Sequence, residues 1–275
     1  MRAGGPQVTA IGDDHALLTA AVRAAGALSL EFFRSDSRSW SKGPGQPVGE
    51  ADLAVDRHLR AALLDARPGY GWQSEESDAV AGTDPARRRW VVDPIDGTRA
   101  FLKGRDEFAL SVALVAGARP VAAVVYNPAR DEFFDAVADG GAWLNGAAIS
   151  VASAAALAGA EVLVSRTELK ELDWPDLLGD CVTTPMSSIA YRLALVAAGR
   201  ADAVVTLRGK SDWDIAAGHL LAAEAGAAVT LADGGPIGYD PPGTRHPTLI
   251  AANPALNSLL VRRLSRELSA CKGAW

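Results

Sequence analysis

A chain of 275 residues with 49% hydrophobic content is long enough to bury a sizeable core, as one large or two closely packed domains. Its net charge of −6, with Lys and Arg scattered along the chain, argues against nucleic acid polymers and anionic membranes as partners and favours small molecules. The two cysteines, Cys181 and Cys271, lack the spacing of a metal site or a disulfide framework, which fits a reducing cytoplasm. The N-terminal segment lacks the apolar core of a secretory signal, and no run reaches the roughly 18 apolar residues of a membrane span.

Two helices are predicted in the first quarter of the chain. The segment after Asp13 and Asp14 repeats apolar residues every three to four positions, which predicts an amphipathic helix capped by one of these aspartates. Residues 34–50 lose this period and gather Ser, Gly and Pro, so we expect a mobile loop there, with Lys42 closing over an anionic ligand. A second helix follows and ends at the Pro-Gly run after residue 66.

The rest of the chain separates into two patterns. Four runs between residues 107 and 149 read as strands separated by Gly, Asn-Pro and Asn-Gly turn signals, which predicts an antiparallel meander. Beyond it, strand and helix patterns alternate up to a last helix near 254–268. We therefore expect an N-terminal α+β half over 1–150 and a C-terminal α/β half over 151–275, with a cleft shared between them.

Acidic residues recur at the ends of predicted elements, in "GEADLAVD" (49–56), "SEES" (74–77), "DPIDGT" (93–98) and "SDWDIAAG" (211–218). Each has an ordinary explanation alone: a solvated pair, a β-turn, or charge complementing a helix N-terminus. Brought to one cleft, however, these carboxylates would repel one another unless positive charge lay between them. Magnesium, which prefers oxygen ligands, would supply that charge.

The run "WVVDPIDGT", preceded by "SEES" and followed by "WDIAAG", resembles the paired signatures of the inositol monophosphatase superfamily. The similarity extends over nearly the whole chain and includes "VVYNPARDEFF" and "LALVAAGRADA". It implies an α/β fold with mixed α+β and α/β halves, arranged as the layered αβαβα sandwich that fructose-1,6-bisphosphatase shares. It also implies a lithium-sensitive phosphomonoesterase that uses two or three Mg²⁺ ions.

The resemblance implies specific roles for residues of the acidic segments. The implied metal ligands are Glu75, Asp93, the carbonyl of Ile95, Asp96 and Asp214. Asp93 would serve both ions. Two metals of this kind can activate a water and stabilise the leaving oxygen of an in-line displacement, without a covalent enzyme intermediate.

A second set of residues matches the family's water-activating group and its substrate contacts. Glu75, Thr98 and Asp52 are the implied catalytic group, in which the Thr hydroxyl orients the attacking water. The expected substrate contacts are Gly97, Thr98, Ser188, Arg208, Lys210 and Asp214. The amides of Gly97 and Thr98 would face the phosphate.

Several positions fall outside the family pattern. Val48 stands where the family commonly has Thr before the helix that carries Asp52, and Met186 stands where relatives usually have Gly before the Ser pair. His58 and His219 lie on helical patterns and are interpreted as structural or surface residues.

The sequence favours a bisphosphate nucleotide as substrate, namely 3′-phosphoadenosine 5′-phosphate. The run "DGTRAFLKGRDEF" is similar to the bisphosphate nucleotidase branch, and Thr206 and Leu207 stand where inositol monophosphatases carry a Glu. Arg208 and Lys210 would bind the second phosphate.

Other functions stay open at this point. Inositol 1-phosphate and histidinol phosphate are the alternative substrates, and a non-catalytic, metal-dependent binding or regulatory protein is the alternative from another class. The complete set of Glu75, Asp93, Asp96, Thr98 and Asp214 favours the enzyme. The sequence leaves open whether the chain forms a homodimer.

Overall fold

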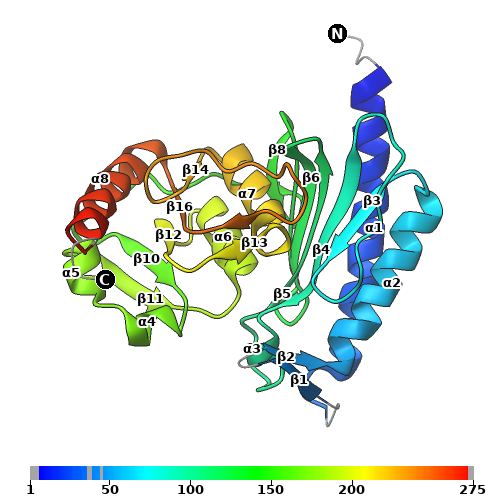
Figure 1. Cartoon of the computed structure of the whole chain (residues 1–275), viewed down its shortest axis with the longest axis horizontal. Coiled ribbons are helices and arrows are strands. Elements are labelled where there is room, and N and C mark those ends of the chain that lie inside the picture. The colour runs from blue at the N-terminus through cyan, green and yellow to red at the C-terminus, as the bar shows by residue number, and fades with distance from the viewer. Residues whose placement is uncertain (1–5, 36–38, 44–45, 272–275) are drawn as a thin grey trace.

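The chain folds into layers in which helices and sheets alternate (Figure 1). The structure is a computed structural model that describes residues 6–35, 39–43 and 46–271. Two paired helices, α1 (Pro6–Phe32) and α2 (Glu50–Ala66), cover one face of a seven-stranded sheet.

The seven-stranded sheet contains the predicted meander and two earlier strands. In pairing order its strands are β3 (Gly71–Ser74), β4 (Arg88–Asp96), β5 (Ala109–Ala116), β6 (Arg119–Asn127), β7 (Glu132–Val137), β8 (Gly141–Leu144) and β9 (Ala147–Ala148). All pairs from β4 onward are antiparallel, which confirms the meander. The pairing of β4 with β5 shifts register between Asp93 and Asp96, where Pro94 offers no N–H to the ladder. The two aspartates therefore leave the regular pairing at the end of β4.

Helices α6 (Ile189–Ala197) and α7 (Asp212–Glu224) form the layer between the two sheets (Figure 1). α7 packs on β5 and β6, and α6 packs on α7. One apolar cluster joins Val125 of the sheet to Leu193 and Leu221 of these helices. Residues of the C-terminal half thus help to build the core against the N-terminal sheet.

The second sheet has five strands. In pairing order these are β11 (Val182–Pro185), β10 (Glu161–Val164), β12 (Ala203–Thr206), β16 (Leu249–Ala252) and β14 (Ala228–Thr230). β10 runs parallel to both of its neighbours, while β16 is antiparallel to β12 and β14. Helices α5 (Trp174–Leu178) and α8 (Pro254–Cys271) form the last layer (Figure 1). The layers confirm the predicted mixed α/β sandwich.

Several short elements show no periodic pattern in the sequence. Among them are α3 (Thr98–Phe101), α4 (Glu168–Glu171) and the paired strands β13 (Lys210–Ser211) and β15 (Arg245–His246). Elements of two to four residues are too short to show a periodic pattern. Both short helices contribute residues to the site described below.

The predicted start of the first helix is wrong. α1 begins at Pro6, and proline is well suited to a first helical turn because its missing N–H would have no partner there. Asp14 therefore lies inside the helix and is not its cap. Its buried carboxylate accepts hydrogen bonds from Arg67 Nε at 2.6 Å and from the Tyr70 hydroxyl at 2.8 Å.

The expectation of an irregular loop over 34–50 is also wrong where this segment is described. β1 (Ser39–Gly43) and β2 (Gln46–Gly49) pair as an antiparallel hairpin. Hydrogen bonds between two short strands need no apolar periodicity, so a Ser- and Gly-rich composition did not exclude them. The side chain of Lys42 lies outside the part of the chain whose side chains are described.

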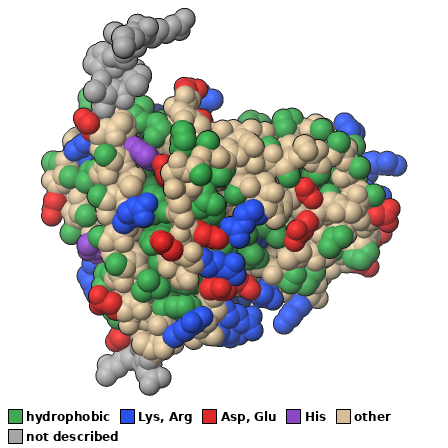
Figure 2. Space-filling view, turned by 180° about the vertical axis from the view of Figure 1, so that it is seen from behind, with side chains coloured by type: hydrophobic (Ala, Val, Ile, Leu, Met, Phe, Trp, Pro, Cys, Tyr) green, Lys and Arg blue, Asp and Glu red, His purple; other side chains and the backbone are tan. Residues whose placement is uncertain are grey.

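The molecular surface is mixed in character. Seen from behind, hydrophobic side chains are spread among polar and charged ones, and Lys and Arg side chains gather in the lower centre (Figure 2). A negative net charge thus coexists with a locally basic region. Within the described ranges, none of the helices combines the length and apolar character needed to cross a membrane.

Candidate active site

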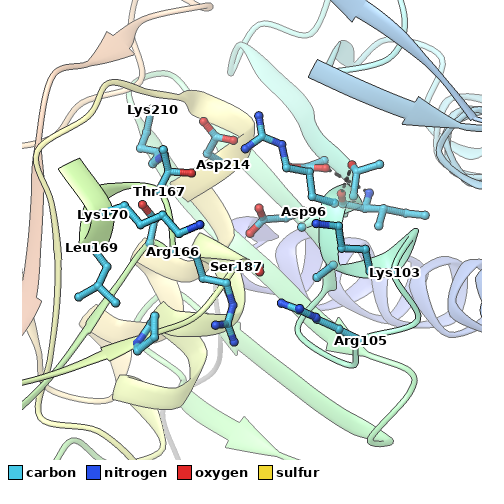
Figure 3. Close-up of a pocket in the computed structure, with 18 of the residues that line it drawn as sticks. Asp96, Lys103, Arg105, Arg166, Thr167, Leu169, Lys170, Ser187, Lys210 and Asp214 are labelled. Carbon is cyan, nitrogen blue, oxygen red and sulfur yellow. Dashed lines mark hydrogen bonds between the residues drawn. The ribbon is translucent and has the colours of Figure 1, made fainter. Parts of the chain in front are cut away.

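A cavity of about 830 Å³ lies where the end of β4 meets α4 and the first turn of α7 (Figure 3). Eight of the residues proposed from the sequence line it: Glu75, Asp93, Ile95, Asp96, Gly97, Thr98, Lys210 and Asp214. Three others, Asp52, Ser188 and Arg208, are not part of its wall. Segments far apart in the sequence therefore meet at one site.

Three carboxylates form the centre of this site. Ligand oxygens of Asp93, Asp96 and Asp214 all lie within 4.8 Å of one another. The irregular end of β4 supplies the first two, and the first turn of α7 supplies Asp214. Asp214 also accepts a hydrogen bond from the Ser211 amide at 2.6 Å, as the third residue of a capping box. The helix start thereby holds the third carboxylate against the strand end.

The negative charges of these buried carboxylates disfavour one another unless a positive charge lies between them. Burial raises the pKa of Asp93 well above its ordinary value, and the carboxylates of Glu75 and Asp96 raise it further. Burial and the neighbouring Asp214 raise the pKa of Asp96 to about 6. Such groups take up either protons or a cation. The donors are all oxygens, so the residues present fit magnesium.

Hydrogen bonds from the start of helix α6 fix the carboxylate of Asp96. The Ser188 hydroxyl and the Ala190 amide both donate to Asp96 Oδ2, each at 2.6 Å. Ser188 is fully buried, so its expected role as a substrate contact does not match its position. It orients a carboxylate of the cluster instead.

Thr98 and Asp52 meet at the side of the cavity. Thr98 Oγ1 lies 3.0 Å from Asp52 Oδ1 and 3.0 Å from the Ile95 carbonyl oxygen. The second oxygen of Asp52 accepts the Gly49 amide at 2.8 Å and so caps α2. Burial raises the pKa of Asp52 to about 6, although these hydrogen bonds to its carboxylate oppose the rise. The Thr98–Asp52 pair forms with Val48, and not the Thr expected from the resemblance, before this helix.

The backbone conformation and close packing at position 97 require a glycine. Its φ is +95°, and a Cβ there would lie 2.8 Å from the carbonyl oxygen of Glu107. Both the left-handed conformation and the close approach exclude a side chain. Gly97 precedes only a single helical turn, α3, so the expected contact between its amide and phosphate stays a prediction.

The two cations expected to bind a second phosphate differ in position. Lys210 lines the cavity, and its charge lowers the pKa of Asp214 against the opposing effect of burial, which dominates. Arg208 is exposed, is not among the residues that line the cavity, and forms an ion pair with Glu171. Glu171 lines the cavity, so Arg208 lies beside the cavity wall without being part of it, and its expected contact with substrate stays a prediction.

Sequence reasoning missed several charged residues around the cavity. Basic side chains not named as site residues line its wall: Arg99, Lys103, Arg105, Arg166 and Lys170. Arg192 is fully buried on α6, where its Nε donates to the Ser188 carbonyl oxygen at 3.2 Å. A charged residue inside the otherwise apolar pattern "IAYRLALVA" was the available signal for Arg192. Neither His58 nor His219 lines the cavity.

Alternating helix and sheet layers with a carboxylate cluster at a strand end define this chain as a layered α/β sandwich protein. The extragenic suppressor protein suhB from Bartonella henselae has the same fold, with a TM-score of 0.81 at 31% identity over 90% of this chain and 96% of that one. The model of the inositol monophosphatase family matches residues 13–269, and the chain belongs to this family.

Two curated relatives are similar over nearly their whole length. Inositol-1-monophosphatase of Mesorhizobium japonicum is 36% identical over 263 residues, which cover 92% of this chain and 96% of that protein. Nus factor SuhB of Escherichia coli is 33% identical over 269 residues, which cover 93% of this chain and 98% of that protein. The relationship thus extends well beyond the acidic motifs.

Proposed function

We propose that this protein is a Mg²⁺-dependent phosphatase that hydrolyses a small phosphate monoester to an alcohol and inorganic phosphate. The observation that carries the proposal is the cluster of Asp93, Asp96 and Asp214, whose oxygens lie within 4.8 Å of one another beside Thr98. Family membership supports the same conclusion.

The acidic residues divide into two proposed ligand sets. Glu75, Asp93 and the Ile95 carbonyl would hold one Mg²⁺ ion, and Asp93, Asp96 and Asp214 would hold a second. When bound, the ions supply a water of lowered pKa and positive charge for the phosphoryl and leaving oxygens. Whether a third ion binds stays a prediction.

The chain's own groups position the reactants. The Thr98 hydroxyl donates to either Asp52 or the Ile95 carbonyl, which leaves its lone pairs free to accept a hydrogen bond from a water. Glu75 lies on the same cavity wall and is the proposed acceptor for a proton of that water. The amide of Gly97 is proposed to face the phosphate, in a backbone conformation that the absence of a side chain permits.

Inositol 1-phosphate is the first candidate substrate. The Mesorhizobium relative is named as an inositol-1-monophosphatase, which supports this choice. The preference for 3′-phosphoadenosine 5′-phosphate has less support from Arg208, because Arg208 does not line the cavity and its charge is paired with Glu171, which does. It remains the second candidate, because Lys210 and further basic residues line the cavity.

A phosphate-release assay with Mg²⁺ tests the proposal. The substrates are inositol 1-phosphate, 3′-phosphoadenosine 5′-phosphate, histidinol phosphate and fructose 1,6-bisphosphate, each with and without LiCl. We expect Mg²⁺-dependent turnover of at least one, and inhibition by lithium. Absence of turnover with every substrate, at protein concentrations where Mg²⁺ binding is measurable, would contradict the phosphatase assignment.

The non-catalytic alternative is supported by one relative's name, Nus factor SuhB. A purely binding role would leave the protein's cellular function intact in Asp93→Asn, whereas a catalytic role would not. Complementation of a deletion strain by this variant therefore distinguishes the two functions.

A further inference from the structure

Three basic residues line the cavity without an acidic partner among the described residues. Lys103 and Arg105 lie in the connection between α3 and β5, and Lys170 lies in α4. Figure 3 shows Lys103 and Arg105 on one side of the cavity and Lys170 on the other. We call these three residues the basic wall.

The other cations of the cavity interact with groups of the protein. Arg166 forms an ion pair with Glu107, which also accepts the Ser187 amide at 3.3 Å. The charge of Lys210 acts on Asp214. Arg99 also has an interaction within the molecule. The three residues of the basic wall have no described ion pair or side-chain hydrogen bond, and, unlike Lys210, none of them is described as acting on a carboxylate of the cluster.

The electrostatics of the site make this arrangement informative. The reacting phosphate would lie against the carboxylate cluster, where cations neutralise it. Lys103 and Arg105 come from one connection and Lys170 comes from α4. All three line the same cavity, in which their positive charges repel one another. An anionic group between them would relieve this repulsion and would form charge-assisted hydrogen bonds.

We propose that the basic wall is a subsite for a second anionic group of the substrate, a phosphate or a carboxylate. The inference rests on the proposed phosphatase function and refines its choice of substrate. It assigns the preferred substrate to the class of phosphate esters that carry two anionic groups, and so favours 3′-phosphoadenosine 5′-phosphate over inositol 1-phosphate, the candidate suggested by the relative's name. A cavity of about 830 Å³ has room for a substrate that reaches both the carboxylate cluster and the basic wall.

Matched substrate pairs test the subsite. Adenosine 3′-phosphate is compared with 3′-phosphoadenosine 5′-phosphate, inositol 1-phosphate with inositol 1,4-bisphosphate, and glycerol 2-phosphate with 2-phosphoglycerate. The first two pairs add a phosphate and the third adds a carboxylate. Each pair is measured with the wild type, Lys103→Met, Arg105→Met, Lys170→Met and the control Arg57→Met, which removes an exposed cation on α2 outside the cavity wall.

The wild type is expected to favour the doubly anionic member of at least one pair. Each basic-wall variant should raise KM for that member about tenfold and leave KM for its singly anionic partner within about twofold. Arg57→Met should change neither value. Equal changes for both members of every pair would overturn the subsite, because they would indicate only a general attraction of anions.

Binding measurements separate this inference from the proposed function. Calorimetry with Ca²⁺ in place of Mg²⁺ compares the same pairs without requiring turnover. A preference for two anionic groups that Lys170→Met removes would support the subsite even if no ester were hydrolysed. Equal affinity within each pair would overturn it. Tighter binding of a single-stranded RNA oligonucleotide that is lost in the same variants would also overturn it, since the wall would then bind a polymer.

Discussion

The Thr98 hydroxyl lies 3.0 Å from Asp52 Oδ1, although 46 positions separate the two residues in the sequence. This contact joins the first residue of α3, just after β4, to the first turn of α2. The other oxygen of Asp52, Oδ2, accepts a hydrogen bond from the Gly49 amide, so the position of Asp52 does not depend on Thr98 alone.

Thr98→Ala is expected to lower kcat by about 10²–10⁴-fold and to leave the apparent Mg²⁺ affinity within about threefold. The reason is that the hydroxyl acts on the orientation of the attacking water and is not a proposed metal ligand. Steady-state kinetics over a Mg²⁺ titration measures both quantities. Thr98→Ser is the control and should retain most of the activity. A parallel loss of Mg²⁺ affinity would make Thr98 a structural residue.

Asp93→Asn is expected to reduce turnover more than tenfold without lowering the metal-free thermal midpoint. Burial and the adjacent carboxylates already disfavour the charged form of Asp93, so a neutral amide should be tolerated in the fold. In the wild type, Mg²⁺ at 100 times its Kd should stabilise the protein by about 2.7 kcal/mol. Thermal unfolding with and without Mg²⁺ should show this rise in the wild type and a much smaller one in the variant. If the variant kept more than about a tenth of the activity, its activation barrier would have risen by less than about 1.4 kcal/mol. That result would exclude Asp93 as a ligand of both ions.

The part of the site that follows from sequence is the part carried by local motifs. "DPIDGT" and "SDWDIAAG" each place a carboxylate at the end of an element, and the structure brings Asp93, Asp96 and Asp214 together. The long helices and the meander were also predictable, since each spans enough residues to show a period.

For charged residues on short or irregular segments, the sequence could not predict which ones line the cavity. Lys170 lies on α4, a single helical turn at the cavity wall, and four residues show no period. Arg208 is adjacent in sequence to a strand end that leads to the site, yet it pairs with Glu171, 37 positions away. Partners that distant are set by tertiary packing, which one sequence does not display.

Gly97→Ala is expected to destabilise the protein by about 2 kcal/mol more than Gly146→Ala does. Both glycines have positive φ, +95° and +81°, so alanine is strained at either position. Only at Gly97 would the new Cβ also meet a backbone atom, the Glu107 carbonyl oxygen, at 2.8 Å; nothing lies within 4 Å at Gly146. Urea unfolding of the metal-free proteins measures the difference. Equal destabilisation would mean that the backbone near Glu107 yields to the new methyl group.

His219 provides a pH-dependent test of the core between the sheets. Its Nδ1 lies 2.9 Å from the Tyr239 hydroxyl, and burial, assisted by the charges of His246 and Arg119, lowers its pKa to about 4. The unfolded chain would protonate this imidazole near pH 6.5. Between these two values the unfolded state binds more protons than the folded state. Stability contributed by neutral His219 is therefore complete above pH 6.5 and is lost as the pH falls toward 4.

His219→Gln keeps a hydrogen-bonding group near Tyr239 and removes this titration. The free energy of unfolding of the wild type minus that of the variant is expected to fall by up to about 3 kcal/mol between pH 7 and pH 4. Urea unfolding at closely spaced pH values measures the difference, and the carboxylate cluster cancels because both proteins contain it. A difference that stays constant over this range would show that the folded protein accepts a proton on His219 as readily as the unfolded chain does. A difference that grows on acidification would mean that folding raises the pKa of this imidazole, which requires an acidic partner close to it.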